Sequence, residues 1–263
     1  MGLVSPPLDP KPGTLIGLGL GPGDPDLMTL KALKALQAAP VVAFPQGRPG
    51  QMGVAQQIVA PHLQAHQIQL PLDFPFVVAD DQLQAAWRRA AAQVWAVLKT
   101  GQDVVFACEG DISFYGTFTY LADALSLAHP DVTIHRIPGV CSPMAAVSAL
   151  DIPLTVQAEK LAVLPAFYGV EDLEHTLDWA DVVVLMKVRS VYTSVWAVLQ
   201  RRYLLSTSYV VVRASQPDQV IYRDLENHPA LELPYFSLMV IRVGKAWPLV
   251  HPPPQTEPPH SAR

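Results

Sequence analysis

Cysteine is scarce in this chain of 263 residues, which contains only Cys108 and Cys141. Two cysteines are too few for a disulfide framework or a cysteine-based zinc cluster. We therefore expect both to be small buried hydrophobic residues in a reducing, cytoplasmic setting. The eight histidines do not fall at the spacings typical of metal ligands, so the sequence predicts no metal site.

Charge is also sparse, since charged residues make up 16% of the chain and the formal net charge is -5. Lysine and arginine form no cluster longer than the pairs Arg88-Arg89 and Arg201-Arg202, so nucleic acid is not an expected partner. No uncharged apolar run approaches the ~20 residues of a membrane-spanning helix, and residues 1–12 lack the apolar run of a signal peptide. We expect no contact with a membrane.

Hydrophobic residues make up 50% of the chain, which favours compact globular domains. The run at 103–108 is apolar throughout, which is the mark of a strand in a sheet covered on both faces. In the first half we expect strands at 14–18, 41–44, 67–72, 103–108 and 132–137, and helices at 27–38, 54–63, 80–99, 117–127 and 143–150. In the second half we expect strands at 160–165, 181–187 and 208–213, helices at 170–179 and 190–203, and a closing antiparallel pair at 219–222 and 235–243.

These elements predict an α/β fold in two parts. An N-terminal α/β domain is expected over residues 13–152 and a C-terminal α/β domain over residues 153–247. Residues 1–12 and the proline-rich residues 248–263 are expected to be disordered ends.

A glycine-rich stretch from Gly17 to Asp24 follows the first predicted strand. Asp24 is a good N-cap and Pro25 suits the first position of a helix, so a helix is expected to begin here. The stretch does not fit the dinucleotide fingerprint, because no glycine occupies the sixth position and no carboxylate follows the next strand. It lacks the Gly-Lys-Ser/Thr of a phosphate-binding P-loop as well. Two interpretations remain open, a tight turn and a ligand-binding loop.

Two further small or acidic loops follow predicted strands. Glu109-Gly110-Asp111 comes after the strand at 103–108, and residues 138–142 come after the strand at 132–137. In an open α/β sheet such loops meet at the carboxyl edge, where ligands bind. Asp111 is therefore the most credible acidic ligand contact, with a helix N-cap as its alternative role.

Four motifs stand in order along the chain. They are Gly17 to Pro25 with Thr29 to Ala32, Glu109 to Asp111 with Phe114 to Gly116, Pro138 to Ser142, and Arg213 to Gln219. Together they resemble the tetrapyrrole methylase family, whose members use S-adenosylmethionine, and the resemblance spans residues 13–243. Cys108 to Asp111, Phe114 to Leu121, Leu185 to Lys187 and Tyr235 to Leu238 most resemble the members that methylate C-20 of precorrin-2 in cobalamin biosynthesis.

The resemblance implies two α/β domains with mixed, largely parallel sheets, a cofactor cleft between them, and a homodimer. It implies S-adenosylmethionine contacts from Pro22, Gly110, Asp111, Phe114, Cys141, Ser142, Met186 and Ala214. Family members commonly have proline where this chain has Ile112, and a small residue where it has Pro143, which puts details of these two loops in doubt.

The implied substrate carries many carboxylates, so we expect local positive charge to bind it. Arg48, Lys187, Arg189 and Arg213 are the candidates, with an ordinary solvated surface charge as the alternative for each. The Tyr115 or Tyr120 hydroxyl is a candidate for orienting the macrocycle, with core packing as the alternative. No catalytic base is assigned. The alternatives are a cobalt-containing substrate of the anaerobic route, another methylation position on the ring, or a nucleotide-binding regulatory module built on the glycine loop.

Overall fold

The computed structural model describes residues 11–47, 51–75, 80–165 and 169–244. The chain divides into two compact units, residues 1–140 and residues 141–263. This division groups the helix α5 (Ser142–Leu150) with the second unit, whereas the sequence placed that helix in the first domain. No helix among the described residues is both long enough and apolar enough to cross a bilayer.

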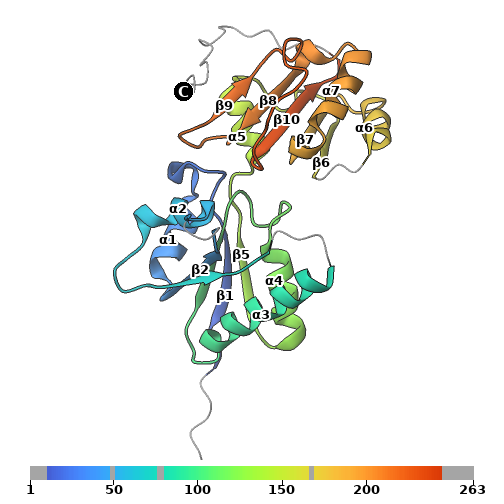
Figure 1. Ribbon diagram of the computed structural model, residues 1–263. Helices are drawn as coiled ribbons and strands as arrows, with labels where there is room; N and C mark the ends of the chain where they lie inside the picture. Colours follow the sequence, from blue (N-terminus) through green and yellow to red (C-terminus); the bar gives the residue numbers. More distant parts are fainter. Residues whose placement is uncertain (1–10, 48–50, 76–79, 166–168, 245–263) are drawn as a thin grey trace, which may run out of the picture. The chain divides into compact units, whose positions relative to one another are not determined.

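The first unit is built on a parallel five-stranded sheet (Figure 1). Its strands are β1 (Thr14–Gly19), β2 (Val41–Pro45), β3 (Ile68–Leu72), β4 (Val104–Cys108) and β5 (Thr133–Ile137), in the order β3-β2-β4-β1-β5. Its α-helices are α1 (Leu30–Ala38), α2 (Val54–Val59), α3 (Asp80–Leu98) and α4 (Phe118–Ala128), with short 3-10 helices η1 (Pro25–Leu27) and η2 (Ala60–His62). The predicted element order of this half is confirmed.

Strand β4 shows why this sheet is covered on both faces. Val104 and Phe106 pack with residues of α3 and α4, whereas Val105 and Ala107 pack with residues of α1 and α2. Because side chains alternate along a strand, an unbroken apolar run fills both cores at once. Figure 1 shows α3 and α4 on one side of this sheet and α1 and α2 on the other.

The second unit contains a mixed five-stranded sheet. Its strands are β6 (Leu161–Leu164), β7 (Val182–Met186), β8 (Ser208–Val212), β9 (Val220–Tyr222) and β10 (Ser237–Arg242), in the order β6-β7-β10-β8-β9. Helices α5, α6 (Val170–Leu177) and α7 (Tyr192–Arg201) accompany it, with the 3-10 helices η3 (Val188–Ser190) and η4 (Leu205–Thr207). Only the β6–β7 pairing is parallel among the pairings of this sheet, so largely parallel describes the first sheet alone.

The predicted pairing of 219–222 with 235–243 is wrong. Strand β10 lies between β7 and β8 and runs antiparallel to both, while β9 pairs with β8 at the edge. Every residue of β10 is buried, whereas the residues of β9 are half-buried. A strand that is buried along its whole length suits the centre of a sheet, and a short half-buried strand suits an edge.

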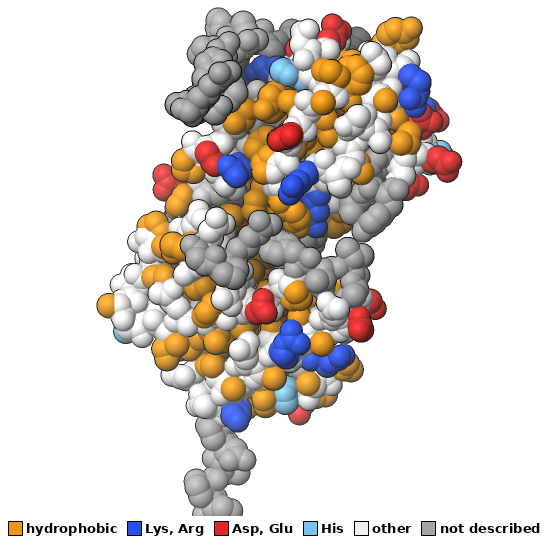
Figure 2. Space-filling model, viewed as in Figure 1, with side chains coloured by type: hydrophobic (Ala, Val, Ile, Leu, Met, Phe, Trp, Pro, Cys, Tyr) orange, Lys and Arg blue, Asp and Glu red, His pale blue; other side chains and the backbone are white. Residues whose placement is uncertain are grey.

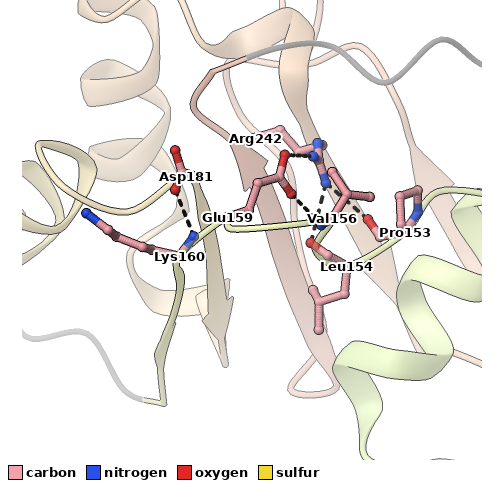
Figure 3. A network of polar contacts seen from close by, with 7 residues as sticks. All are labelled: Pro153, Leu154, Val156, Glu159, Lys160, Asp181 and Arg242. Atoms are coloured by element: carbon pink, nitrogen blue, oxygen red, sulfur yellow. Dashed lines mark hydrogen bonds and ion pairs between the residues drawn. The ribbon is translucent and has the colours of Figure 1, made fainter.

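Arg242, at the end of β10, ties the segment that follows α5 to the second sheet (Figure 3). Its side chain is only 3% exposed. One guanidinium nitrogen, Nη1, donates to the carbonyl oxygens of Pro153 (3.1 Å) and Leu154 (3.4 Å), and Nη2 donates to Oε1 of Glu159 (2.6 Å). Oε2 of Glu159 accepts from the backbone N–H of Val156 at 2.9 Å. The buried charge is thus paired and hydrogen-bonded, as a buried charge requires.

A second arginine fixes the helix itself. Arg223 donates to the carbonyl oxygens of Leu150 (2.9 Å) and Ala149 (3.3 Å) at the end of α5. These carbonyls belong to the last turn of a helix, where no intrahelical donor remains and a cation is favourable. Arg223 and Arg242 together hold α5 and residues 153–159 against the second sheet.

Candidate functional site

Three loops come together at the carboxyl edge of the first sheet. They follow β4, β1 and β5, which are neighbours in that order. The backbone N–H of Leu20 donates to the carbonyl oxygen of Cys108 at 2.9 Å. Beyond it, Gly21 and Gly110 exchange two backbone hydrogen bonds of 3.1 and 2.7 Å. The predicted meeting of these loops is confirmed.

Glycine is required where the loop backbones touch. A Cβ atom added to Gly19 would lie 2.5 Å from the backbone nitrogen of Gly139. A Cβ atom added to Gly139 would lie 2.5 Å from the carbonyl oxygen of Gly110. No real Cβ sits so close to backbone atoms, so side chains are excluded from this side of the junction.

The other side of the junction is open. Gly110 has a φ of +73°, which glycine adopts without strain, and an added Cβ would meet no atom within 4 Å. The backbone of Gly110 is therefore accessible to a ligand atom at close range.

Asp111 fixes the junction with its carboxylate. Oδ2 accepts from the backbone N–H of Gly139 at 2.8 Å, and Oδ1 accepts from the backbone N–H (2.9 Å) and the hydroxyl (2.6 Å) of Ser113. Burial alone would raise the pKa of this carboxyl, but the hydrogen bonds from Ser113, Gly139 and Phe114 outweigh it and hold the pKa below its ordinary value. Asp111 does not cap α4, because that helix begins at Phe118. Its carboxylate is a fixed negative charge.

The helix predicted to begin at Asp24 starts later. Asp24 accepts from the backbone N–H of Asp26 at 2.9 Å and caps only the short η1. Helix α1 begins at Leu30, and its N-cap is Thr29, whose Oγ1 accepts from Ala32. No α-helix N-terminus follows directly on the glycine loop, and the N–H groups of Leu20 and Gly21 already have partners. A phosphate would find few donors here.

Phe114, Tyr115 and Pro22 lie in the same loops. The Phe114 ring is half-buried and contacts the Tyr115 ring edge-on, with 4.8 Å between the centroids. Tyr115 is 51% exposed and has a φ of 54°, an uncommon conformation for a tyrosine. Pro22 is buried next to Gly21. The structure thus brings the described site residues predicted in the first unit to one edge of its sheet.

The second unit collects its predicted residues at the edge where β7 and β8 end. Met186 ends β7, and the buried Ala214 follows β8. Because β10 begins between these two strand ends, Met186 lies opposite Leu238, and the N–H of Arg213 donates to the carbonyl oxygen of Phe236 at 2.7 Å. These residues therefore lie at one sheet edge.

The predicted cations of the second unit have different surroundings. Lys187 has a left-handed backbone, and its Nζ lies 5.7 Å from the centroid of the Tyr235 ring, within cation–π range. Arg213 forms an ion pair with Asp218, and Arg189 is exposed on η3. Arg48 lies outside the described residues.

Cys141 and Ser142 stand where α5 begins. Cys141 occupies the N-cap position and Ser142 the first helical position, and both are half-buried. Pro143, one of the two departures from the family pattern, is accommodated in the first turn, where its missing N–H leaves no carbonyl without a partner. No group of three His, Cys, Asp or Glu in the described ranges could hold a metal ion.

One functional candidate was missed from the sequence. Glu109 directly follows β4, is half-buried, and has a pKa raised by burial. The sequence does carry a signal for this, because Glu109 directly follows a strand that is apolar throughout. A carboxyl at the end of such a strand has little water around it, which raises its pKa.

Comparison with known proteins gives a consistent family. The family model for tetrapyrrole (corrin/porphyrin) methylases matches residues 14–229. The cobalt-precorrin-2 C(20)-methyltransferase of Salmonella typhimurium is 29% identical over 89% of this chain and 98% of its own length. The precorrin-2 C(20)-methyltransferase of Sinorhizobium is 30% identical over 87% of this chain and 95% of its own length.

A longer relative matches as well. The cobalamin biosynthesis protein CobIJ of Mycobacterium tuberculosis is 32% identical over 89% of this chain, but only 46% of its length is covered. The chain thus spans about half the length of that relative.

Among solved structures, uroporphyrin-III C-methyltransferase from Thermus thermophilus, complexed with S-adenosylhomocysteine, has a TM-score of 0.62. It is 23% identical, and the match covers 88% of this chain and 97% of that one, which establishes a shared α/β fold. From the family model and from the Sinorhizobium relative, the chain belongs to the tetrapyrrole (corrin/porphyrin) methylases.

Proposed function

We propose that this chain is an S-adenosylmethionine-dependent methyltransferase that adds a methyl group to C-20 of precorrin-2, giving precorrin-3A in cobalamin biosynthesis. The proposal is supported by family membership and by the Salmonella and Sinorhizobium relatives, both named for methylation of C-20 of a precorrin-2. The observation that carries it is the junction of the three loops, which has a packed glycine side, an open side at Gly110 and the fixed carboxylate of Asp111 beside it.

The junction suits a cofactor that has hydroxyl and amino donors. Each oxygen of an ionised carboxylate can accept more than one hydrogen bond, so Asp111 keeps acceptor capacity while it holds Gly139 and Ser113. We assign the cofactor to Pro22, Gly110, Asp111 and Phe114 in the first unit. Cys141, Ser142, Met186 and Ala214 are the assigned contacts in the second unit.

The chemistry places few demands on the protein's own functional groups. S-adenosylmethionine, when bound, supplies a methyl carbon on a sulfonium, which an electron-rich ring carbon attacks. The residues of the chain have to align the two reactants and exclude water, and holding reactants in place can supply about 7–11 kcal/mol of a barrier. Glycine backbones fixed by hydrogen bonds suit this task, because they do not have to reorganise during the reaction.

Binding of the substrate carboxylates is assigned to Arg48, Lys187, Arg189 and Arg213, with Tyr115 orienting the macrocycle. On the face shown in Figure 2, acidic and basic side chains are interspersed in both units. A mixed surface on a chain of net charge -5 offers no long-range attraction to a polyanion, so binding would depend on individual cations. The ion pair of Arg213 with Asp218 means that a substrate carboxylate would compete with Asp218.

Two alternatives keep the same chemistry. The substrate could be cobalt-precorrin-2, for which the Salmonella relative is named, or the methyl group could go to another ring position, since the family model covers corrin and porphyrin methylases in general.

A nucleotide-binding module is disfavoured, because the N–H groups of Leu20 and Gly21 bond to neighbouring backbone and Asp24 places a carboxylate at η1. We further propose that the enzyme is a cytoplasmic homodimer.

Calorimetry separates the two classes of function. The methyltransferase proposal requires that S-adenosylhomocysteine binds the protein and that ATP at the same concentration does not displace it. Binding of ATP with indifference to S-adenosylhomocysteine would refute the proposal. Incubation with metal-free and with cobalt-containing precorrin-2 then decides between the two substrates.

A further inference from the structure

Glu109 is held in place by backbone hydrogen bonds on both sides of it. The residue before it, Cys108, accepts from the N–H of Leu20, and the residue after it, Gly110, exchanges two bonds with Gly21. The backbone of Glu109 therefore cannot move without breaking the junction of the first two loops. Glu109 is half-buried and lies between Cys108, which ends β4, and Gly110, at whose open side the cofactor is proposed to bind.

The carboxyl group of Glu109 has almost no polar support. Within the part of the chain that the structure describes, its only hydrogen-bond donor is its own backbone N–H. Asp111, two residues further on, accepts from Gly139 and from both donors of Ser113. Burial raises the pKa of Glu109, while hydrogen bonds hold that of Asp111 below its ordinary value. A raised pKa makes the ionised carboxylate of Glu109 the stronger base of the two, while Asp111 stays charged and is a weak base.

The thiol next to Glu109 does not suit proton transfer, because Cys108 is buried and burial raises the pKa of its thiol. Residues 19–25, 109–117 and 137–141 contain no lysine, arginine or histidine. No cation on these segments therefore opposes the effect of burial on Glu109.

Methylation of a meso carbon leaves a proton to be removed. As the carbon–carbon bond forms, the carbon–sulfur bond breaks and its electron pair stays on sulfur. C-20 carries one hydrogen, and conjugation of the ring is restored only when that hydrogen leaves as a proton. We propose that the Glu109 carboxylate accepts this proton and is the general base of the reaction, an inference that rests on the proposed function.

A base acts only in its ionised form. The rate of methyl transfer should therefore rise with pH and level off, with a midpoint above the ordinary pKa of a glutamate, because the raised pKa keeps Glu109 protonated to a higher pH. Asp111 remains ionised throughout this range, since its pKa is lowered, and so it contributes no second step.

The test compares Glu109→Gln and Glu109→Asp with the wild type. Transfer of labelled methyl to the tetrapyrrole is measured across neutral pH, and affinity for S-adenosylhomocysteine is measured by calorimetry. Glu109→Gln should lower kcat by ~10²–10⁴-fold, a typical contribution of general base catalysis, and abolish the rise with pH. Glu109→Asp keeps a carboxylate at shorter reach and should retain a rise with pH at reduced kcat. Glu232→Gln, at an exposed position, is the matched control and should behave as wild type.

The results distinguish this inference from the proposed function. If the wild type methylates the tetrapyrrole and Glu109→Gln does so with the same kcat and pH profile, Glu109 is not the base. Loss of S-adenosylhomocysteine binding in both Glu109 variants would assign it a structural role and also overturn the inference. A wild type that binds S-adenosylhomocysteine but transfers no methyl to any tetrapyrrole would refute the proposed function, and the role of Glu109 with it.

Discussion

Gly21 and Gly110 exchange two backbone hydrogen bonds, although they come from loops that follow different strands. Both have positive φ values, +84° and +73°, which only glycine adopts without strain. The pair connects the loop after β1 to the loop after β4 through backbone alone. Side chains at these positions are unnecessary for the contact, and their absence leaves the open side of Gly110 free.

Gly110→Ala should weaken cofactor binding more than it weakens folding. An added Cβ meets no protein atom within 4 Å, so the cost to stability is the strain of a left-handed alanine, about 1–2 kcal/mol. The new methyl group occupies the space that we assign to the cofactor. Calorimetry with S-adenosylhomocysteine and thermal unfolding of the same samples measure the two effects.

Gly139→Ala and Gly169→Ala are the matched controls. A Cβ on Gly139 would collide with the carbonyl oxygen of Gly110, so this variant should lose more stability than Gly110→Ala. Gly169 has open space and no positive φ, so its alanine variant should change neither property. If Gly110→Ala bound S-adenosylhomocysteine as tightly as Gly169→Ala, the cofactor would lie elsewhere.

The stability of the Asp111→Asn variant should fall less steeply in acid than that of the wild type. The pKa of Asp111 is lowered in the folded protein, so its carboxylate contributes stability above its ordinary pKa, and this contribution is lost as the pH falls through the lowered value. An asparagine has no such dependence. Urea unfolding between neutral pH and about pH 3 should show a shallower decline for the variant, which is also less stable at neutral pH.

Ser113→Ala provides the comparison for Asp111. It removes the hydroxyl that donates to Oδ1 and leaves the backbone donors in place. The pKa of Asp111 should rise toward its ordinary value, because the Ser113 hydroxyl is the largest of the contributions that lower it. A decline in acid identical for wild type, Ser113→Ala and Asp111→Asn would show that the carboxylate is not stabilised as described.

Arg242→Lys should destabilise the second unit by about 2–4 kcal/mol. A lysine cannot donate in the same geometry to Pro153, Leu154 and Glu159. A half-buried carboxylate and two carbonyl oxygens would therefore lose donors. Arg201→Lys is the control, because the Arg201–Glu174 pair is exposed and should be worth at most about 1 kcal/mol. Denaturant unfolding measures the free energy of unfolding of both variants. Equal losses of stability in Arg242→Lys and Arg201→Lys would contradict a stabilising role for the buried network.

The two cysteines should differ in reactivity. Cys108 is buried, which raises the pKa of its thiol, whereas Cys141 is half-buried before α5. A thiol reagent should modify Cys141 and spare Cys108 in the folded protein. If Cys141 contacts the cofactor, S-adenosylhomocysteine should slow its modification, which peptide mapping by mass spectrometry measures. Equal rates of modification with and without the ligand would show that Cys141 is not part of the site.

The sequence predicted the strands better than their partners. The apolar runs of β4 and β10 were visible because each fills a core, and the loops that follow β1, β4 and β5 met as expected. The position of β10 between β7 and β8 was not predictable, because pairing between distant strands is a tertiary choice that local pattern does not encode. Asp24 has the residue type of a helix N-cap, but Thr29 has it too, and only packing decides which one begins α1.

Electrostatic roles were the least predictable part of the site. Asp111 stood out because it follows a glycine at a strand end. Its hydrogen bond with the N–H of Gly139 was not predictable, because it joins residues far apart in the sequence. Glu109 was overlooked, because its importance comes from the burial and the missing donors around it. The Arg213–Asp218 pair likewise depends on a left-handed turn at Arg213 that the residue type does not suggest.

The central claim is transfer of a methyl group from S-adenosylmethionine to C-20 of a precorrin-2. The direct measurement incubates the protein with methyl-labelled cofactor and, in parallel, with metal-free and cobalt-containing precorrin-2, and then locates the label by NMR. We predict label on C-20 with at least one substrate and formation of S-adenosylhomocysteine in equal amount. Label at another ring carbon, or none with either substrate while S-adenosylhomocysteine still binds, would contradict the account.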